Sequence, residues 1–213
     1  HRASHLTAYQ NARYAERYKA TLALLVAAET QHFGVPGVAS MTAAKMLFKL
    51  MAIKDEYEVA RLFTDGRFKS KLAEQFSSFD RIDYHLAPPF LARKGADGLP
   101  KKMRIGKVIE PAFRLLAKMR GIRGTWLDLF GNTTERRMER ALLVEYEAEI
   151  ARMASKLDKE NLSQVIEFLS YPDKVRGFGH VRQNSLDRTV ESKNKMEINV
   201  KNPDKNPEKI AAE

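Results

Sequence analysis

The 213 residues contain 37 lysines or arginines against 27 acids, which gives a formal net charge of +10, and they contain no cysteine. The missing cysteine excludes disulfides, thiolate nucleophiles and cysteine-ligated zinc or iron–sulfur centres from this chain. No apolar run approaches the roughly 18 residues that span a bilayer, and no secretory signal pattern opens the sequence. We therefore expect a cytoplasmic protein without a membrane segment.

Composition favours an α-rich fold. Hydrophobic residues make up 44% and charged residues 30% of the chain, as in ordinary globular proteins, and helix-forming residues are abundant. We expect a mainly α protein with a small antiparallel β-sheet of two or three strands, an α+β arrangement. One α-rich domain should cover residues 1–190, and residues 191–213, polar and interrupted by two prolines, should form a flexible tail.

The N-terminal part predicts one long helix, within residues 1–35. Apolar residues recur at helical spacing from Leu6 to His32, and the Gly and Pro residues of FGVPG, residues 33–37, end the pattern. A second helix should follow directly.

The apolar period then changes to two residues, which predicts strands. Val59, Arg61 and Phe63 alternate with their neighbours, so we expect a short strand around residues 58–63. The same alternation recurs around residues 81–87 and 101–108. The last two segments predict an antiparallel hairpin with a basic outer face.

Helices dominate the remaining sequence. Pro111 fits the first turn of a helix. Asn132, three residues before Glu135, resembles a capping box, and Asp158 can cap a further helix. A connector with three glycines spans residues 121–131, and we expect three of its side chains to attach it to the core: Trp126, Leu129 and Phe130.

Basic residues concentrate between residues 101 and 140, where eleven lysines or arginines and four acids give a net charge of +7. Such a block favours nucleic acid, a phosphorylated ligand or an acidic protein surface as a partner. Arg104 and Arg123 belong to this block and are candidate contacts for an anion or a neighbouring domain.

ERRMER, residues 135–140, is the strongest anion candidate. Arg136 and Arg140 lie four residues apart on one helix face and could clamp a phosphate or carboxylate, with Arg137 and the helix N-terminus beside them. The alternative is ion pairing with the neighbouring glutamates on a solvated face.

Three further pairs of residues could meet a substrate or another domain. Arg61 and Asp65 flank a turn, although Asp65 followed by glycine is also typical of a turn that binds its own backbone. His85 alternates onto the same strand face as Asp83, a possible acid–base partner, or is a surface histidine. Arg176 and His180 in RGFGHVR either hold a turn between helices or face another domain.

No motif of another functional class stands out. The five histidines lack metal-ligand spacing, and neither a nucleophile elbow nor a phosphate loop is present. The basic residues interleave with acids rather than with stacking aromatics, which disfavours nucleic acid.

Several strings, taken in order, resemble one family. They are LTAYQNARYAERY (6–18), KLMAIKDEYEVARLFTDGRF (49–68), YHLAPPFLARK (84–94), PAFRLLAKMRGIRGTWLDLFG (111–131), TERRMERALLVEYE (134–147) and VRGFGHV (175–181). Together they resemble the C-terminal region of the long, fused bacterial form of indolepyruvate ferredoxin oxidoreductase, a region without an assigned function. The resemblance covers about residues 5–190.

The resemblance implies a parent enzyme that oxidatively decarboxylates arylpyruvates to aryl-acetyl-CoA and reduces ferredoxin. The family uses thiamine diphosphate, magnesium, iron–sulfur clusters and coenzyme A. Without cysteine or a Gly-Asp-Gly motif with its downstream Asn, this chain is expected to hold none of these cofactors, and no catalytic residue carries over.

The expected role is a non-catalytic structural or interface domain. Its partners would be the upstream catalytic domains, on which residues 1–35 could pack, and ferredoxin or a second subunit. The alternative is a stand-alone basic module that binds nucleic acid.

Overall fold

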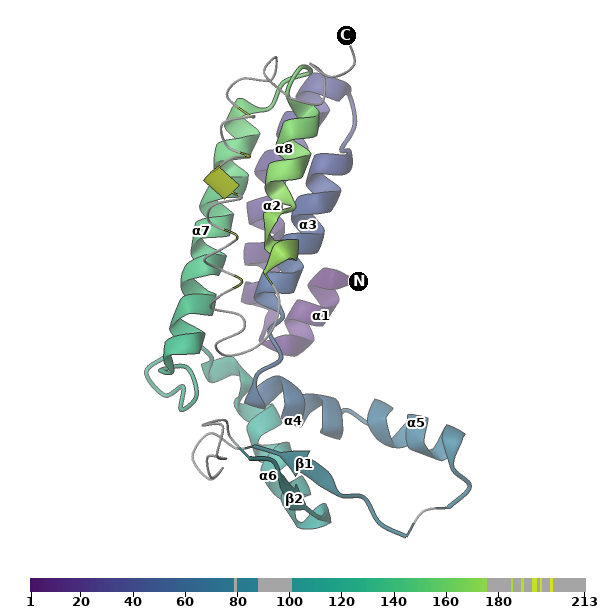
Figure 1. The fold of residues 1–213 in the computed structure, drawn as a ribbon. Coiled ribbons are helices and arrows are strands. Elements are labelled where there is room, and N and C mark those ends of the chain that lie inside the picture. Colours follow the sequence, from purple (N-terminus) through teal and green to yellow (C-terminus); the bar gives the residue numbers. More distant parts are fainter. Residues whose placement is uncertain are drawn as a thin grey trace. The chain divides into compact units, whose positions relative to one another are not determined.

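The computed structural model describes most of the chain: residues 1–78, 80–87 and 101–175, with positions 185, 189, 193, 194, 196 and 200. These residues form a mainly helical fold with one two-stranded antiparallel sheet (Figure 1), so the predicted fold class is confirmed. None of the helices in this described part is long and apolar enough to cross a membrane.

The chain forms two compact units, each with its own core. The first, here the bundle unit, consists of His1–Ala52 and Thr134–Glu213; the second, the inserted unit, is the intervening Ile53–Thr133. The prediction of a single domain over residues 1–190 did not anticipate this division.

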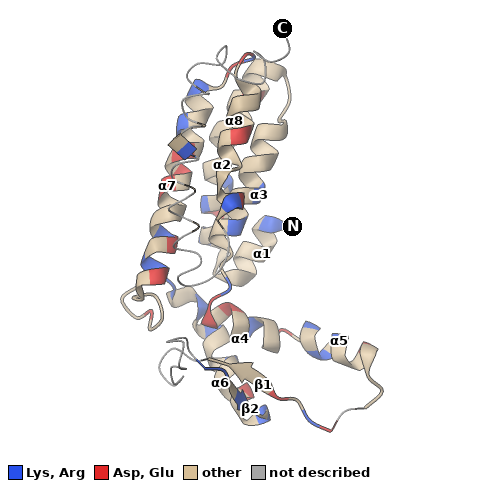
Figure 2. Ribbon diagram, viewed as in Figure 1, with Lys and Arg blue, Asp and Glu red and all other residues tan. Residues whose placement is uncertain are grey.

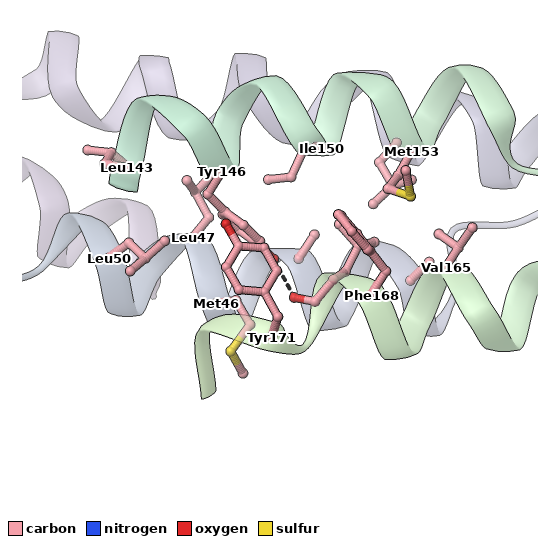
Figure 3. Close-up of a cluster of buried hydrophobic side chains, with 14 of the residues drawn as sticks. Met46, Leu47, Leu50, Leu143, Tyr146, Ile150, Met153, Val165, Phe168 and Tyr171 are labelled. Carbon is pink, nitrogen blue, oxygen red and sulfur yellow. Dashed lines mark hydrogen bonds between the residues drawn. The ribbon is translucent and has the colours of Figure 1, made fainter. Parts of the chain in front are cut away.

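The bundle unit consists of helices that lie side by side around one apolar core (Figure 1). In this core Leu47 of α3, Ile150 of α7 and Phe168 of α8 are fully buried (Figure 3). The Tyr146 hydroxyl donates to the carbonyl of Leu169 at 2.7 Å, so this buried polar atom is satisfied. The elements are α1 (Arg2–Tyr9), α2 (Ala12–Phe33), α3 (Val38–Met51), α7 (Thr134–Lys156), α8 (Leu162–Leu169) and the 3₁₀ turn η3 (Tyr171–Lys174).

The predicted single N-terminal helix is wrong, because the helix is interrupted at Asn11. Asn11 adopts an extended backbone, and its side chain accepts a hydrogen bond from the amide of Tyr14 at 2.9 Å. This is the geometry of an N-cap, so α2 begins anew after α1. Between α7 and α8, Asn161 rather than Asp158 is the N-cap residue. Asp158 instead accepts from the amide of Asn161.

A buried carboxylate organises the turn between α2 and α3, which we call the Glu29 turn (residues 29–41). Glu29 is 1% exposed and accepts from the amides of Gly37, Ala39 and Ser40 at 2.8–2.9 Å, and from the Ser40 hydroxyl. A Cβ on Gly37 would lie 3.0 Å from the Glu29 Oε1, so a larger residue there would push against the Glu29 carboxylate. The outer side of the turn is apolar, with Val35, Val38 and Met41 exposed.

The same contacts shift the ionisation of Glu29. Burial by itself raises the pKa of the Glu29 carboxyl, but the hydrogen bonds from Ser40, Gly37 and Ala39 favour the charged form. The pKa is consequently lower than the ordinary value of 4.5.

The inserted unit packs short helices against the hairpin. Its core joins Ala60 of α4, Tyr84 of β1 and Phe113 of α6, and the Phe63 ring centroid lies 5.0 Å from that of Tyr84 and 5.4 Å from that of Phe113. The elements are α4 (Glu56–Thr64), α5 (Arg67–Gln75), β1 (Tyr84–Leu86), β2 (Met103–Ile105), η1 (Lys107–Ile109), α6 (Glu110–Lys118) and η2 (Met119–Ile122).

The strand predicted around residues 58–63 is wrong, because these residues belong to α4. Asp55 is the N-cap of this helix: its Oδ1 accepts from the amide of Glu58 at 2.8 Å. The helical spacing also lets Arg61 pair with Glu58 three residues earlier, which alternation in a strand would prevent. The hairpin prediction is confirmed, since Tyr84 pairs with Ile105 and Leu86 with Met103.

Candidate interaction surface

A loop in the inserted unit, residues 124–131, is held from inside by one carboxylate; we call it the tryptophan loop. Asp128 is 6% exposed, and its Oδ2 accepts from the amide of Gly124 at 2.8 Å. Its Oδ1 accepts from the amide of Gly131 at 3.0 Å. Gly124 has a φ of +74°, a left-handed conformation that favours glycine. The two ends of the loop are therefore tied to the same side chain.

The side chains behind the tryptophan loop connect it to the start of α4. The Tyr57 hydroxyl donates to Asp128 Oδ1 at 3.1 Å, and burial together with Asp128 raises the pKa of Tyr57, which keeps the phenol a donor. The Arg123 guanidinium lies 5.2 Å above the Tyr57 ring. Its Nε and Nη2 donate to the two oxygens of Asp55 at 2.6 and 2.8 Å. This bidentate pair fixes the chain at the entrance of the loop.

The outer side of the tryptophan loop is apolar and open to solvent. Trp126 is 87% exposed, Leu129 62% and Leu127 49%. The prediction that Trp126 and Leu129 attach the connector to the core is therefore wrong. Phe130 alone of the three does so, with its ring centroid 5.3 Å from that of Tyr57. Asp128 holds the backbone so that its neighbours on both sides face outward.

Basic residues precede the loop on α6 and η1. Lys107, Arg114 and Lys118 are exposed, and between them the apolar side chains of Val108 and Leu115 are exposed as well. Of the two acids of residues 101–131, Glu110 partly neutralises this surface, because its Oε2 lies 3.7 Å from Arg114 Nη2. Asp128 is buried, and Glu110 accepts from Lys69 at 2.9 Å and Tyr84 at 3.2 Å.

Arg123 and Arg61, two predicted contact residues, bind carboxylates of their own unit. Arg123 pairs with Asp55, as described above. Arg61 donates to both oxygens of Glu58 at 2.7 and 2.8 Å and to Asp65 at 3.3 Å, and these hydrogen bonds raise its pKa further. Asp65 also accepts from the amide of Arg67, and Gly66 has a φ of +87°. This is the backbone turn that was the alternative reading of the Asp65–Gly66 pair.

Arg104 and His85 lie directly opposite each other on the hairpin. Both are exposed, which places them on the same outer face of the sheet. Arg104 donates to Asp83 at 2.9 Å, and Arg81 donates to the same carboxylate oxygen. Asp83 is thus engaged by two arginines, an arrangement that disfavours the acid–base pair with His85.

Arg136, Arg137 and Arg140 belong to α7 in the bundle unit. Arg136 Nη1 donates to Glu139 Oε2 at 2.6 Å, and Glu139 is only 4% exposed, so the ion-pairing alternative describes this arginine. Arg137 and Arg140 are exposed. Figure 2 shows residues of both charges along α7, as expected for a solvated helix face. Arg176 and His180 lie outside the described residues.

The structure adds functional residues that sequence reasoning missed. Asp55, Tyr57 and Asp128 form one buried polar network with Arg123, although all three were unremarkable in the sequence. A usable signal was the spacing of Asp55 and Glu58, which matches a capping box. No comparable pattern in the sequence indicates that the Trp126 side chain is exposed. Among the described residues, no group of three or more His, Asp or Glu side chains could hold a metal ion.

Comparison with known proteins gives one match. No curated protein and no solved structure is similar to the chain. A family model does match, over residues 1–195, and its description is a family of unknown function, DUF6537. Because this match spans most of the sequence, the protein with the tryptophan loop and the Glu29 turn belongs to the DUF6537 family.

Proposed function

We propose that the chain is a non-catalytic interface domain of a cytoplasmic enzyme that resembles indolepyruvate ferredoxin oxidoreductase. The parent enzyme would decarboxylate arylpyruvates to aryl-acetyl-CoA and pass electrons to ferredoxin. Thiamine diphosphate, magnesium, the iron–sulfur clusters and coenzyme A would be held by other parts of that enzyme. The ordered resemblance of six sequence strings supports the parent, and the tryptophan loop supports the role.

The observation that carries this proposal is the exposure of Trp126 on an ordered loop. Soluble surfaces tolerate single apolar residues, but here Trp126, Leu127 and Leu129 are exposed within four positions. Asp128 holds the backbone beneath them, so little conformational entropy remains to be lost when a partner binds. Tryptophan at the centre of an interface commonly contributes about 2 kcal/mol or more to binding.

Three arginines that were candidate contacts for an anion or another domain also support the interface role. Arg61, Arg123 and Arg136 are held in ion pairs with acids of their own unit. These contacts stabilise the units in which they lie rather than present cations to a substrate. The exposed apolar side chains of the loop are therefore the groups of this unit on which the proposed interface rests.

The test is a double substitution, Trp126→Ser with Leu129→Ser, in the complete enzyme. We expect weaker assembly, measured by analytical ultracentrifugation, and reduced turnover with indolepyruvate. The helical circular dichroism should stay unchanged, because both side chains are exposed. The matched control is Leu24→Ser on α2, which is 54% exposed and lies in the other unit.

Normal assembly and normal turnover in the double variant would refute the interface role. Turnover that is lost with intact assembly would also contradict the proposal, since it would place the loop in the chemistry rather than at a contact.

A further inference from the structure

We infer that the partner of the tryptophan loop is an acidic protein segment that carries apolar anchor residues. The inference rests on the proposed interface role and adds the chemistry of the partner. Two observations lead to it: the sign of the exposed charges on the segment that precedes the loop, and the kind of apolar side chain that the loop presents.

The exposed charges before the loop have one sign. Over residues 101–131 the exposed charged residues are all basic, because the two acids are either buried or bound within the unit. A surface of one sign attracts a partner of the opposite sign. The basic residues concerned are Lys101, Lys102, Arg104, Lys107, Arg114 and Lys118, of which Arg104 pairs with Asp83 and Arg114 with Glu110.

The apolar residues favour a protein over a nucleic acid. Nucleic-acid surfaces stack successive bases on several aromatic rings. The loop offers one exposed ring, Trp126, flanked by the aliphatic Leu127 and Leu129, and Val108 and Leu115 are exposed before it. Aliphatic side chains lack the π-face on which bases stack, but they suit the apolar core of a protein interface. An apolar centre with charged surroundings is the usual anatomy of a protein interface.

Trp126 provides a direct readout, because it is the only tryptophan in the 213 residues. At 87% exposure its indole should emit as a hydrated ring. Burial of the ring in a partner should shift this emission to the blue. No other tryptophan contributes to that signal.

The experiment titrates the 213-residue chain with three probes at low salt. The first is a helical peptide with glutamates on one face and leucines on the other; the second is the same peptide with its leucines replaced by serines; the third is single-stranded oligodeoxythymidine. We expect a saturable blue shift with the first probe alone, and an affinity that falls as salt is added.

Variants separate the contributions of the tryptophan and of the basic residues to the affinity. A fluorescent label on the first peptide reports binding to each variant. Trp126→Ala should weaken its binding by about 30-fold, as expected for a central tryptophan. Arg114→Gln with Lys118→Gln should weaken it by about tenfold at low salt and have little effect at high salt. Arg13→Gln, at an exposed arginine of α2 in the bundle unit, is the matched control and should leave the affinity unchanged.

Three results would overturn the inference. They are tighter binding of the oligonucleotide than of the first peptide, equal binding of the two peptides, and no blue shift with the first peptide at low salt. If assembly of the complete enzyme still depends on Trp126 in any of these cases, the interface role stands and only the acidic partner is refuted.

Discussion

Glu29 in the bundle unit and Asp128 in the inserted unit are both buried carboxylates that hold a turn from inside. The two turns differ in their backbone, because a helix begins at only one of them, and in the charge of the residues that surround them in the sequence. Glu29 accepts three amides at the start of α3, where the helix dipole also favours an anion. Asp128 lies in a loop without a helix and accepts the Gly124 and Gly131 amides and the Tyr57 hydroxyl. The Glu29 turn should therefore be the more stable of the two.

The surfaces above the two carboxylates differ as well. Residues 30–44 contain no Lys, Arg, Asp or Glu, in a chain with 30% charged residues. The tryptophan loop instead follows a segment whose exposed charges are all basic. A buried carboxylate thus lies beneath an uncharged apolar surface in one unit and beneath an apolar loop that follows a basic segment in the other. A buried carboxylate shapes a turn without deciding what binds to it.

The largest effect is expected for Glu29→Gln, which should lower the free energy of unfolding by about 3 kcal/mol. The substitution removes charge-assisted hydrogen bonds and turns an amide NH₂ toward backbone N–H donors. Denaturant unfolding followed by circular dichroism measures the loss. The control is Glu16→Gln on the same helix, where a 67% exposed side chain should matter by less than about 0.5 kcal/mol. A loss below about 1 kcal/mol for Glu29→Gln would contradict this account.

The pH dependence of the Glu29 effect follows from its lowered pKa. Because the folded pKa lies below the ordinary value of 4.5, the charged carboxylate stabilises the fold fully above pH 4.5. That contribution is lost as the pH falls through the folded pKa. The stability difference between the wild type and Glu29→Gln should therefore be constant near neutral pH and shrink below pH 4.5. A difference that grows on acidification would be the opposite of what the hydrogen bonds require.

Asp128→Ala should cost about 2 kcal/mol in the inserted unit, because it leaves the buried Tyr57 hydroxyl and two loop amides without their acceptor. It should also release the loop. The decay of Trp126 fluorescence anisotropy should accordingly show faster local motion than in the wild type. Tyr57→Phe is the milder control, since it removes one hydrogen bond and leaves the loop amides bound. Unchanged Trp126 motion in Asp128→Ala would show that other contacts hold the loop.

The smallest effects are expected for alanine substitutions at two glycines with a left-handed backbone, Gly34 and Gly124. Gly34 ends α2 with a φ of +83° and Gly124 opens the tryptophan loop with +74°, and neither has an atom within 4 Å of an added Cβ. Alanine at either position should therefore cost only the backbone strain, about 1 kcal/mol. Hydrogen exchange should place the loss near the Glu29 turn for Gly34→Ala and near the loop for Gly124→Ala. A much larger loss at one site would reveal a contact beyond backbone strain.

Much of the helical framework was predictable because long apolar stripes determine which face packs inward. The helix predicted after Asn132 is α7, whose buried face includes Tyr146, Ile150 and Met153. Pro111 marked the first turn of α6. The hairpin was predicted correctly from the two-residue apolar period of its strands. The strand prediction for residues 58–63 was wrong because a short run of alternating apolar residues fits a helix as well as a strand. The N-cap hydrogen bond of Asp55 and the ion pair between Glu58 and Arg61 stabilise the helix instead.

The candidate site was less predictable, because exposure is a tertiary property. Trp126 and Leu129 look like core residues in the sequence, and only the contacts of Asp128 explain why they face outward. Arg123 and Arg61 looked available for an anion until the structure placed Asp55 and Glu58 against them. Residue type indicated which side chains could bind, but three-dimensional pairing determined which were already bound.

The order of the units along the chain has a consequence for synthesis. During translation residues 53–133 leave the ribosome before α7, so the inserted unit can fold first. Meanwhile α2 and α3 have no α7 or α8 to cover their apolar faces, because the contact of Arg17 with Glu147 spans 130 positions of sequence. The nascent bundle therefore passes through a stage in which two helices expose the side chains that later form its centre. Chaperone binding should concentrate on this stage.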